Sequence, residues 1–220
     1  MGSRRFEAAL FDLDGVVFNT EPQYAEFWSS QFREFYPNEK GLEFAIKGQT
    51  LVEIYDRFFS GPLASERLLI TERLCAYERS MSFDYVNGIE DFVKELKSKG
   101  IKMAVVTSSD LSKMVIVRQK RPEFFEWMDA VLTAEDFLRS KPDPDCYIKA
   151  ALRLGIDIKG CVVFEDSFNG LRSGRSAGMA TIALATTNPA ESLEPLADMV
   201  TGDFTQLSYD ICLNLLRKDI

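Results

Sequence analysis

Apolar residues along this chain follow two patterns, short continuous runs and runs with helical spacing. The first continuous run covers residues 6–11, contains one charge, Glu7, and ends abruptly at two carboxylates, Asp12 and Asp14. Short apolar runs bounded by turn residues are typical of buried β-strands. The same pattern predicts strands at residues 101–106, 130–132, 161–164 and 181–184, and a marginal one at 199–200.

Between residue 17 and residue 82 the pattern is only helical. Thr20 and Thr50 are each followed, three residues on, by a residue that completes a capping box, Gln23 and Glu53 respectively. These boxes predict the starts of two helices, and helical spacing predicts a third over residues 65–80. Aromatic residues on the first helix predict a core within this segment rather than a ligand platform, namely Phe27, Trp28 and Phe32.

In the rest of the chain, amphipathic helices alternate with the strands. They are predicted at residues 89–96, from 111 into the 120s, from about 144 to 154 and over 169–177. This alternation indicates a parallel sheet with right-handed crossovers. The predicted fold is therefore α/β, with a Rossmann-like parallel-sheet core (residues 1–16 and 86–220) and an inserted helical cap (residues 17–85). Linkers near residues 15–18 and 83–88 would let the helical insert hinge.

Composition narrows the classes of function. A net charge of −8 over 220 residues argues against nucleic acid or an anionic membrane as the main partner, because both favour a basic surface. The absence of histidine excludes Ser-His-Asp triads and histidine zinc sites. The four cysteines form no CxxC pair and are expected to be reduced. Without a signal peptide or a spanning apolar run, we expect a cytoplasmic protein, monomeric rather than an obligate oligomer.

Polar residues that follow the predicted strands form the candidate site. In an open parallel sheet, ligands bind at the carboxyl ends of the strands. The residues at those ends are Asp12, Asp14, Thr107, Ser108, Ser109, Lys141, Glu165 and Asp166. They offer what phosphoryl transfer through an aspartyl-phosphate requires: a nucleophilic carboxylate, oxygen ligands for Mg²⁺, donors for the phosphoryl oxygens and a second carboxyl for the leaving alcohol.

Along the chain these residues form four ordered motifs, Asp12-Leu13-Asp14-Gly15, Thr107 after a strand, Lys141-Pro142-Asp143-Pro144 and Glu165-Asp166-Ser167. The motifs resemble those of the haloacid dehalogenase (HAD) superfamily. The helical insert resembles the superfamily's C1 cap, of the β-phosphoglucomutase and phosphoglycolate phosphatase type. The resemblance covers essentially the whole chain, and it implies a HAD-like fold and Mg²⁺ as the cofactor.

The resemblance also implies roles for individual residues. Asp12 would be the nucleophile and a metal ligand, and Asp14 the general acid/base, which binds the metal through its backbone carbonyl. The remaining roles are phosphoryl binding for Thr107, Ser108 and Lys141, and metal binding for Asp166 and, directly or through water, Glu165.

In the insert, Lys47-Gly48-Gln49 resembles the loop that sets substrate specificity in such caps, although a plain turn between helices is the other interpretation. Three positions depart from the family pattern. Asn19 stands where an Asp is often found, Tyr24 where many relatives have His, and Asn87-Gly88 where Pro-Gly is usual. These departures leave the substrate open.

The leading interpretation is a Mg²⁺-dependent phosphatase acting on a small phosphorylated metabolite, a sugar or polyol phosphate. A phosphomutase of the β-phosphoglucomutase kind would use the same residues, with Lys47 as the candidate contact for a second phosphate. A third interpretation is a catalytically silent binding protein on the same scaffold. The intact Asp12, Asp14, Lys141 and Asp166 count against it.

Overall fold

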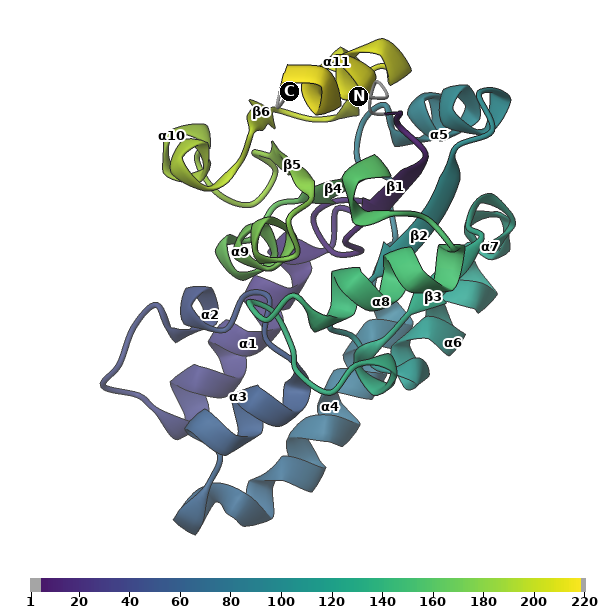
Figure 1. Ribbon diagram of the computed structural model, residues 1–220. Helices are drawn as coiled ribbons and strands as arrows, with labels where there is room; N and C mark the ends of the chain where they lie inside the picture. Colours follow the sequence, from purple (N-terminus) through teal and green to yellow (C-terminus); the bar gives the residue numbers. More distant parts are fainter. Residues whose placement is uncertain (1–4, 219–220) are drawn as a thin grey trace.

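The computed structural model describes residues 5–218, and at its centre lies a parallel β-sheet (Figure 1). Within that range the sheet has six strands in the order β3-β2-β1-β4-β5-β6, with every neighbouring pair parallel. The strands are β1 (Ala8–Phe11), β2 (Lys102–Val106), β3 (Ala130–Leu132), β4 (Cys161–Glu165), β5 (Ala180–Leu184) and β6 (Met199–Thr201). The predicted α/β fold is confirmed. Strand order reverses between β1 and β4, which is where doubly wound sheets bind ligands.

The central strands are buried on both faces. Successive residues of a strand point to opposite sides, so Ala9 and Phe11 of β1 pack into one apolar core and Ala8 and Leu10 into another. One face is covered by α5 (Ile89–Ser98), α6 (Leu111–Lys120), α7 (Pro122–Trp127) and α11 (Tyr209–Lys218), the other by α8 (Asp145–Leu154) and α9 (Phe168–Ser176), with α10 (Ala190–Leu193) beside β6. This double cover explains why the strands are continuous apolar runs rather than alternating ones.

Between β1 and α5 the chain forms a helical part with a core of its own. Its helices are α1 (Glu21–Phe35), α2 (Leu42–Ala45), α3 (Leu51–Phe58) and α4 (Arg67–Ser80). The predicted aromatic stripe is buried in this core, where Phe27, Trp28 and Phe32 pack with Phe58 and Phe59. In Figure 1 these helices lie below the sheet, at the side to which its strands point.

The first helix of the insert begins after Thr20 as predicted, but its predicted capping box is wrong. Thr20 precedes α1, but its backbone is already helical (φ −100°, ψ −18°), so its side chain makes no cap hydrogen bond. An N-cap side chain reaches the helix N–H groups from an extended backbone instead. The helix predicted over residues 65–80 is α4, and it begins at Arg67 because Gly61–Glu66 forms a 3₁₀ helix. At Thr50 the predicted capping box with Glu53 is confirmed.

The helical part joins the sheet through two segments that lie side by side. The N–H of Val86 donates to the carbonyl of Val17 at 3.0 Å, and that of Asn19 donates to the carbonyl of Asp84 at 2.8 Å. Both connections therefore pass through one narrow region, which is the geometry a hinge needs. Motion about it stays a prediction.

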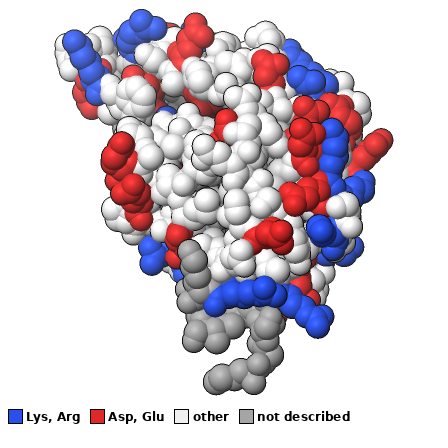
Figure 2. Space-filling model, turned by 90° about the horizontal axis from the view of Figure 1, so that it is seen from above, with Lys and Arg blue, Asp and Glu red and all other residues white. Residues whose placement is uncertain are grey.

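The surface shown in Figure 2 carries mixed charge. Acidic and basic side chains lie interspersed around a largely uncharged centre of this face. The face therefore lacks the continuous basic field that anionic polymers favour. Within residues 5–218, none of the helices combines the length and the apolar character needed to span a bilayer.

Candidate active site

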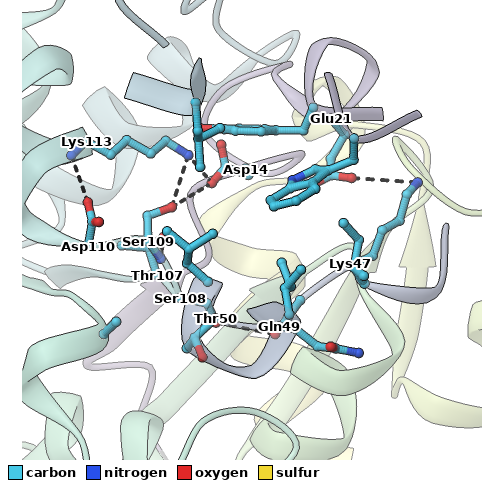
Figure 3. A pocket seen from close by; sticks show the side chains of 18 of the residues that line it. Asp14, Glu21, Lys47, Gln49, Thr50, Thr107, Ser108, Ser109, Asp110 and Lys113 are labelled. Atoms are coloured by element: carbon cyan, nitrogen blue, oxygen red, sulfur yellow. Dashed lines mark hydrogen bonds and ion pairs between the residues drawn. The ribbon is translucent and has the colours of Figure 1, made fainter. Parts of the chain in front are cut away.

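A cavity of about 440 Å³ lies between the carboxyl end of the sheet and the helical part (Figure 3). Most of the predicted site residues line it: Asp12, Asp14, Thr107, Ser108 and Asp166 from the sheet side, and Lys47, Gly48 and Gln49 from the helical part. Lys141 and Glu165 are buried behind Asp12 and bind to it or to each other. The fold thus brings residues from separate strand ends and from the insert to one place.

A buried lysine holds Asp12. The ammonium of Lys141, a residue only 2% exposed, donates to Asp12 Oδ1 at 2.5 Å, Glu165 Oε1 at 2.7 Å and the Val106 carbonyl at 3.0 Å. These three acceptors use all of its N–H donors. Burial lowers the pKa of Lys141, but the carboxylates of Asp12 and Glu165 raise it well above the ordinary lysine value. Burial raises the pKa of Asp12 to about 7, although Lys141 lowers it.

Glu165 has both of its carboxylate oxygens occupied by protein donors. Oε1 accepts from Lys141 and from the Tyr147 hydroxyl at 2.9 Å, and Oε2 accepts from the N–H groups of Asp166 and Ser167, each at 3.1 Å. A Cβ at Gly170 would lie 1.7 Å from Oε1, so the side chain sits where only glycine leaves room. Glu165 therefore positions Lys141 and the loop after β4.

Three carboxylates form a cluster that fits a divalent cation. Asp12, Glu165 and Asp166 place ligand oxygens within 4.8 Å of one another. Burial is the largest cause that raises the pKa of Asp166 well above its usual value, so a cation beside it would be strongly favoured. Gly15 (φ +80°) leaves space for this group, because a Cβ there would lie 2.1 Å from Asp166 Oδ2. Hard oxygen donors in such a group are the ligands that Mg²⁺ prefers.

Asp14 lies in different surroundings from Asp12. Its Oδ1 accepts from the Thr20 hydroxyl at 2.5 Å. Its Oδ2 accepts from the Ser109 hydroxyl at 3.2 Å and from the Lys113 ammonium at 2.5 Å (Figure 3). Thr20, predicted as a helix cap, thus binds the second carboxylate of the first motif instead.

Lys113 is a site residue that the sequence pattern does not reveal. A lysine near the start of an amphipathic helix is ordinarily solvated, whereas Lys113 is 2% exposed. The available signal is its spacing from Ser109, four residues earlier, which places both on one side of the chain as α6 begins.

The loop after β2 links the sheet to the helical part. The Thr107 hydroxyl accepts from the Ser109 N–H at 3.0 Å, which bends the loop over the strand end. The Ser108 hydroxyl donates to the Gly48 carbonyl in the insert at 3.4 Å. Ser140, the neighbour of Lys141, also contacts the insert by donating to the Glu53 carboxylate.

The helical part supplies the far wall of the cavity. Lys47 lies 3.6 Å from Glu21 (Figure 3), and burial raises the pKa of Glu21 to about 7. Gln49 donates to the Ala45 carbonyl at 2.9 Å. Most of the wall is apolar or aromatic, with Tyr24, Ala25, Trp28, Ile46, Leu51, Ile54, Tyr55 and Leu74. The cavity therefore has a charged floor and a mostly apolar roof, in which the charged residues are Glu21, Glu43, Lys47 and Glu78.

Comparison with known proteins agrees with this arrangement. Residues 9–184 match the family of haloacid dehalogenase-like hydrolases. Hexitol phosphatase A from Escherichia coli is 30% identical over 211 residues, which cover 93% of this chain and 94% of that protein. A beta-phosphoglucomutase from Mycobacterium bovis is 24% identical over 243 residues, which cover 92% of each chain. The structure of a HAD hydrolase, family IA, variant 3, from Entamoeba histolytica has a TM-score of 0.83 at 24% identity and covers 96% of this chain and 99% of its own. The match over most of the chain, together with the ordered motifs at the strand ends, shows that the chain belongs to the haloacid dehalogenase-like hydrolase family.

Proposed function

We propose that this protein is a Mg²⁺-dependent phosphatase that hydrolyses a small sugar or polyol phosphate through an aspartyl-phosphate on Asp12. The observation that carries the proposal is the contact of buried Lys141 with Asp12, with Asp14 and Asp166 in the same cavity. A nucleophilic carboxylate has to be ionised and fixed, and an ammonium at 2.5 Å serves both needs. The similarity to hexitol phosphatase A supports a phosphorylated polyol as the substrate class.

In this proposal each group at the cavity floor has one task. Asp12 attacks the phosphorus while Thr107 and Ser108 bind the phosphoryl oxygens, whose charge needs stabilisation in the transition state. Lys141, predicted to bind the phosphoryl group as well, would hold Asp12 instead, because Asp12, Glu165 and the Val106 carbonyl take all of its donors. As the bond from phosphorus to the leaving oxygen breaks, Asp14 gives that oxygen a proton. Asp14 then takes a proton from the water that hydrolyses the aspartyl-phosphate.

Asp12, Asp166 and the backbone carbonyl of Asp14 would hold the Mg²⁺ ion. When bound, the ion supplies positive charge that offsets the repulsion between these carboxylates and the phosphate. Glu165 would contribute mainly through Lys141 and the loop after β4, because protein donors already occupy its oxygens.

Residues 17–85 would act as a cap over this floor. Support comes from the cavity wall that they form, from the contacts of Gly48 and Glu53 with the loops of the sheet, and from the adjacent linkers. A cap that opens for the substrate and closes over it would exclude bulk water during the reaction.

The charges in the cavity favour a phosphatase over a mutase. A mutase has to bind a second phosphate, and this needs a free cation on the cap side. Of the described residues that line the cavity, the cations are Lys47 and Lys113, and each pairs with a carboxylate, Glu21 at 3.6 Å and Asp14 at 2.5 Å. Further acids line the same space, namely Glu43, Glu78, Asp110 and Glu135. An uncharged leaving group fits this environment better than an anionic one.

The test is phosphate release from a panel of esters, measured with Mg²⁺ and again with EDTA. The panel contains hexitol and hexose phosphates, glycerol phosphates, glucose 1-phosphate and p-nitrophenyl phosphate. We expect release from at least one sugar or polyol phosphate, with the activity lost in EDTA and in Asp12→Asn but kept in Asp210→Asn, a control at an exposed position of α11. Formation of glucose 6-phosphate from glucose 1-phosphate would identify the mutase, and no turnover of any ester would identify the silent binding protein.

A further inference from the structure

Lys113 is a buried cation that the proposed reaction does not yet use. Its ammonium donates to Asp14 Oδ2 at 2.5 Å and to the Ser109 hydroxyl at 3.0 Å. It also lies 4.4 Å from the centre of the Tyr24 ring. Burying an ammonium is costly unless such partners compensate it, so a position 2% exposed requires them.

The start of α6 sets where this ammonium lies. Asp110 is the N-cap residue of α6, and its carboxylate accepts from the backbone N–H of Lys113 at 3.0 Å (Figure 3). With the helix start held in this way, the Lys113 side chain enters the cavity beside Ser109 and Asp14. Its placement follows from a rigid element rather than from a mobile loop.

The partners of Lys113 belong to both parts of the molecule. Asp14 and Ser109 follow strands of the sheet, whereas Tyr24 is on α1 of the helical part. The Tyr24 hydroxyl in turn donates to the Glu78 carboxylate on α4 at 2.7 Å. The acidic groups that face the ammonium are therefore Asp14 at direct contact, and Glu78 and Glu21 from the helical part.

We propose that Lys113 is the positioning residue for Asp14 in its acid/base role, an inference that depends on the phosphatase function proposed above. Thr20 binds one oxygen of the Asp14 carboxyl, and Lys113 with Ser109 binds the other, so rotation of the carboxyl group is restricted from two sides. Because Lys113 also contacts Tyr24, this arrangement is complete only when the helical part lies over the sheet.

The reaction step that depends on this positioning is the first one. Asp12 forms a bond to phosphorus, the bond from phosphorus to the leaving oxygen breaks with its electron pair on that oxygen, and the proton of Asp14 moves to it, which releases an alcohol. An alkoxide needs this proton, whereas p-nitrophenolate leaves without it. A defect in the position of Asp14 should therefore slow alkyl esters selectively.

The experiment compares two substrates in matched variants. The substrates are p-nitrophenyl phosphate and the alkyl phosphate with the highest kcat/KM in the ester panel, because kcat/KM reports the steps up to release of the alcohol. For Lys113→Met we expect kcat/KM to fall about 100-fold with the alkyl ester and less than about 5-fold with p-nitrophenyl phosphate. Lys113→Arg should recover most of the alkyl-ester activity. Arg118→Met removes an exposed cation of the same helix and is the control.

Two results would overturn the inference. One is an equal loss of kcat/KM with both substrates, which indicates a structural or general electrostatic role. The other is no loss with either. If Lys113→Met does not fold, as judged by its thermal unfolding, Ser109→Ala replaces it, and a smaller but still selective loss is expected. Failure of the proposed function is distinct, because the wild-type protein would then hydrolyse neither ester or Asp12→Asn would remain active.

Discussion

Replacing Lys141 with methionine should destabilise the protein through charge rather than through packing. Methionine has a similar length, so it leaves little empty space, but it removes the ammonium that lies 2.5 Å from Asp12 and 2.7 Å from Glu165. Removing one member of a buried ion pair costs about 3–5 kcal/mol, because the remaining charge has no compensation. We therefore expect the free energy of unfolding of Lys141→Met to fall by about this amount.

Urea unfolding followed by circular dichroism in EDTA measures this change without a contribution from bound metal. In Lys141→Met combined with Glu165→Gln, one of the two carboxylates is neutral, and we expect about 1–2 kcal/mol to be recovered. Lys159→Met removes an exposed lysine and is the matched control.

The pH dependence of this loss gives a second check. Asp12 has a pKa of about 7 even with Lys141 present, and without the ammonium both carboxylates bind protons more readily in the folded state. Folded carboxyls with raised pKa values favour folding less as the pH rises. The loss in free energy of unfolding caused by Lys141→Met should therefore be larger at pH 8 than at pH 5. A loss below about 1 kcal/mol, or no recovery with Glu165→Gln, would refute the proposed electrostatic role of Lys141.

Three further predictions concern packing, pH and substrate charge. Gly170→Ala should lower the free energy of unfolding by about 1–3 kcal/mol or more, because its Cβ would lie 1.7 Å from Glu165 Oε1. Gly202→Ala should have little effect, because no atom lies within 4 Å of a Cβ there. Equal urea midpoints for the two variants would contradict this prediction. Burial raises the pKa of Glu21 from 4.5 to about 7, so in EDTA this group should contribute up to about 3 kcal/mol to a loss of stability as the pH rises from 4.5 to 7. Glu21→Gln should flatten that slope in urea unfolding, and an unchanged slope would argue against a raised pKa at Glu21. An ester whose leaving group carries a carboxylate should have a kcat/KM about tenfold or more below that of its neutral isostere, because acidic residues outnumber basic ones around the cavity. Equal kcat/KM values would show that the cavity charges do not select the substrate.

The hydrophobic pattern predicted the strands, the helices between them and the edge of the sheet at which the motif residues meet. Buried parallel strands have to be continuous apolar runs, and the carboxyl ends of such strands meet at one edge of the sheet. Asp12, Thr107, Lys141 and Asp166 were therefore predicted as neighbours although they are far apart in the chain. The aromatic core of the helical part followed in the same way from residues that recur at helical spacing.

Only the tertiary structure decided which partner a polar side chain takes on another element. Thr20 has the sequence of a helix cap but binds Asp14, and Glu165 is surrounded by protein donors from α8 and from the loop after β4. Lys113 resembles a solvated lysine until α1 and the first motif are packed against α6. Spacing along one element carries no information about the element that lies across from it. Burial by such a neighbour turns an ordinary lysine into a compensating charge, because water is no longer available to solvate the carboxylate.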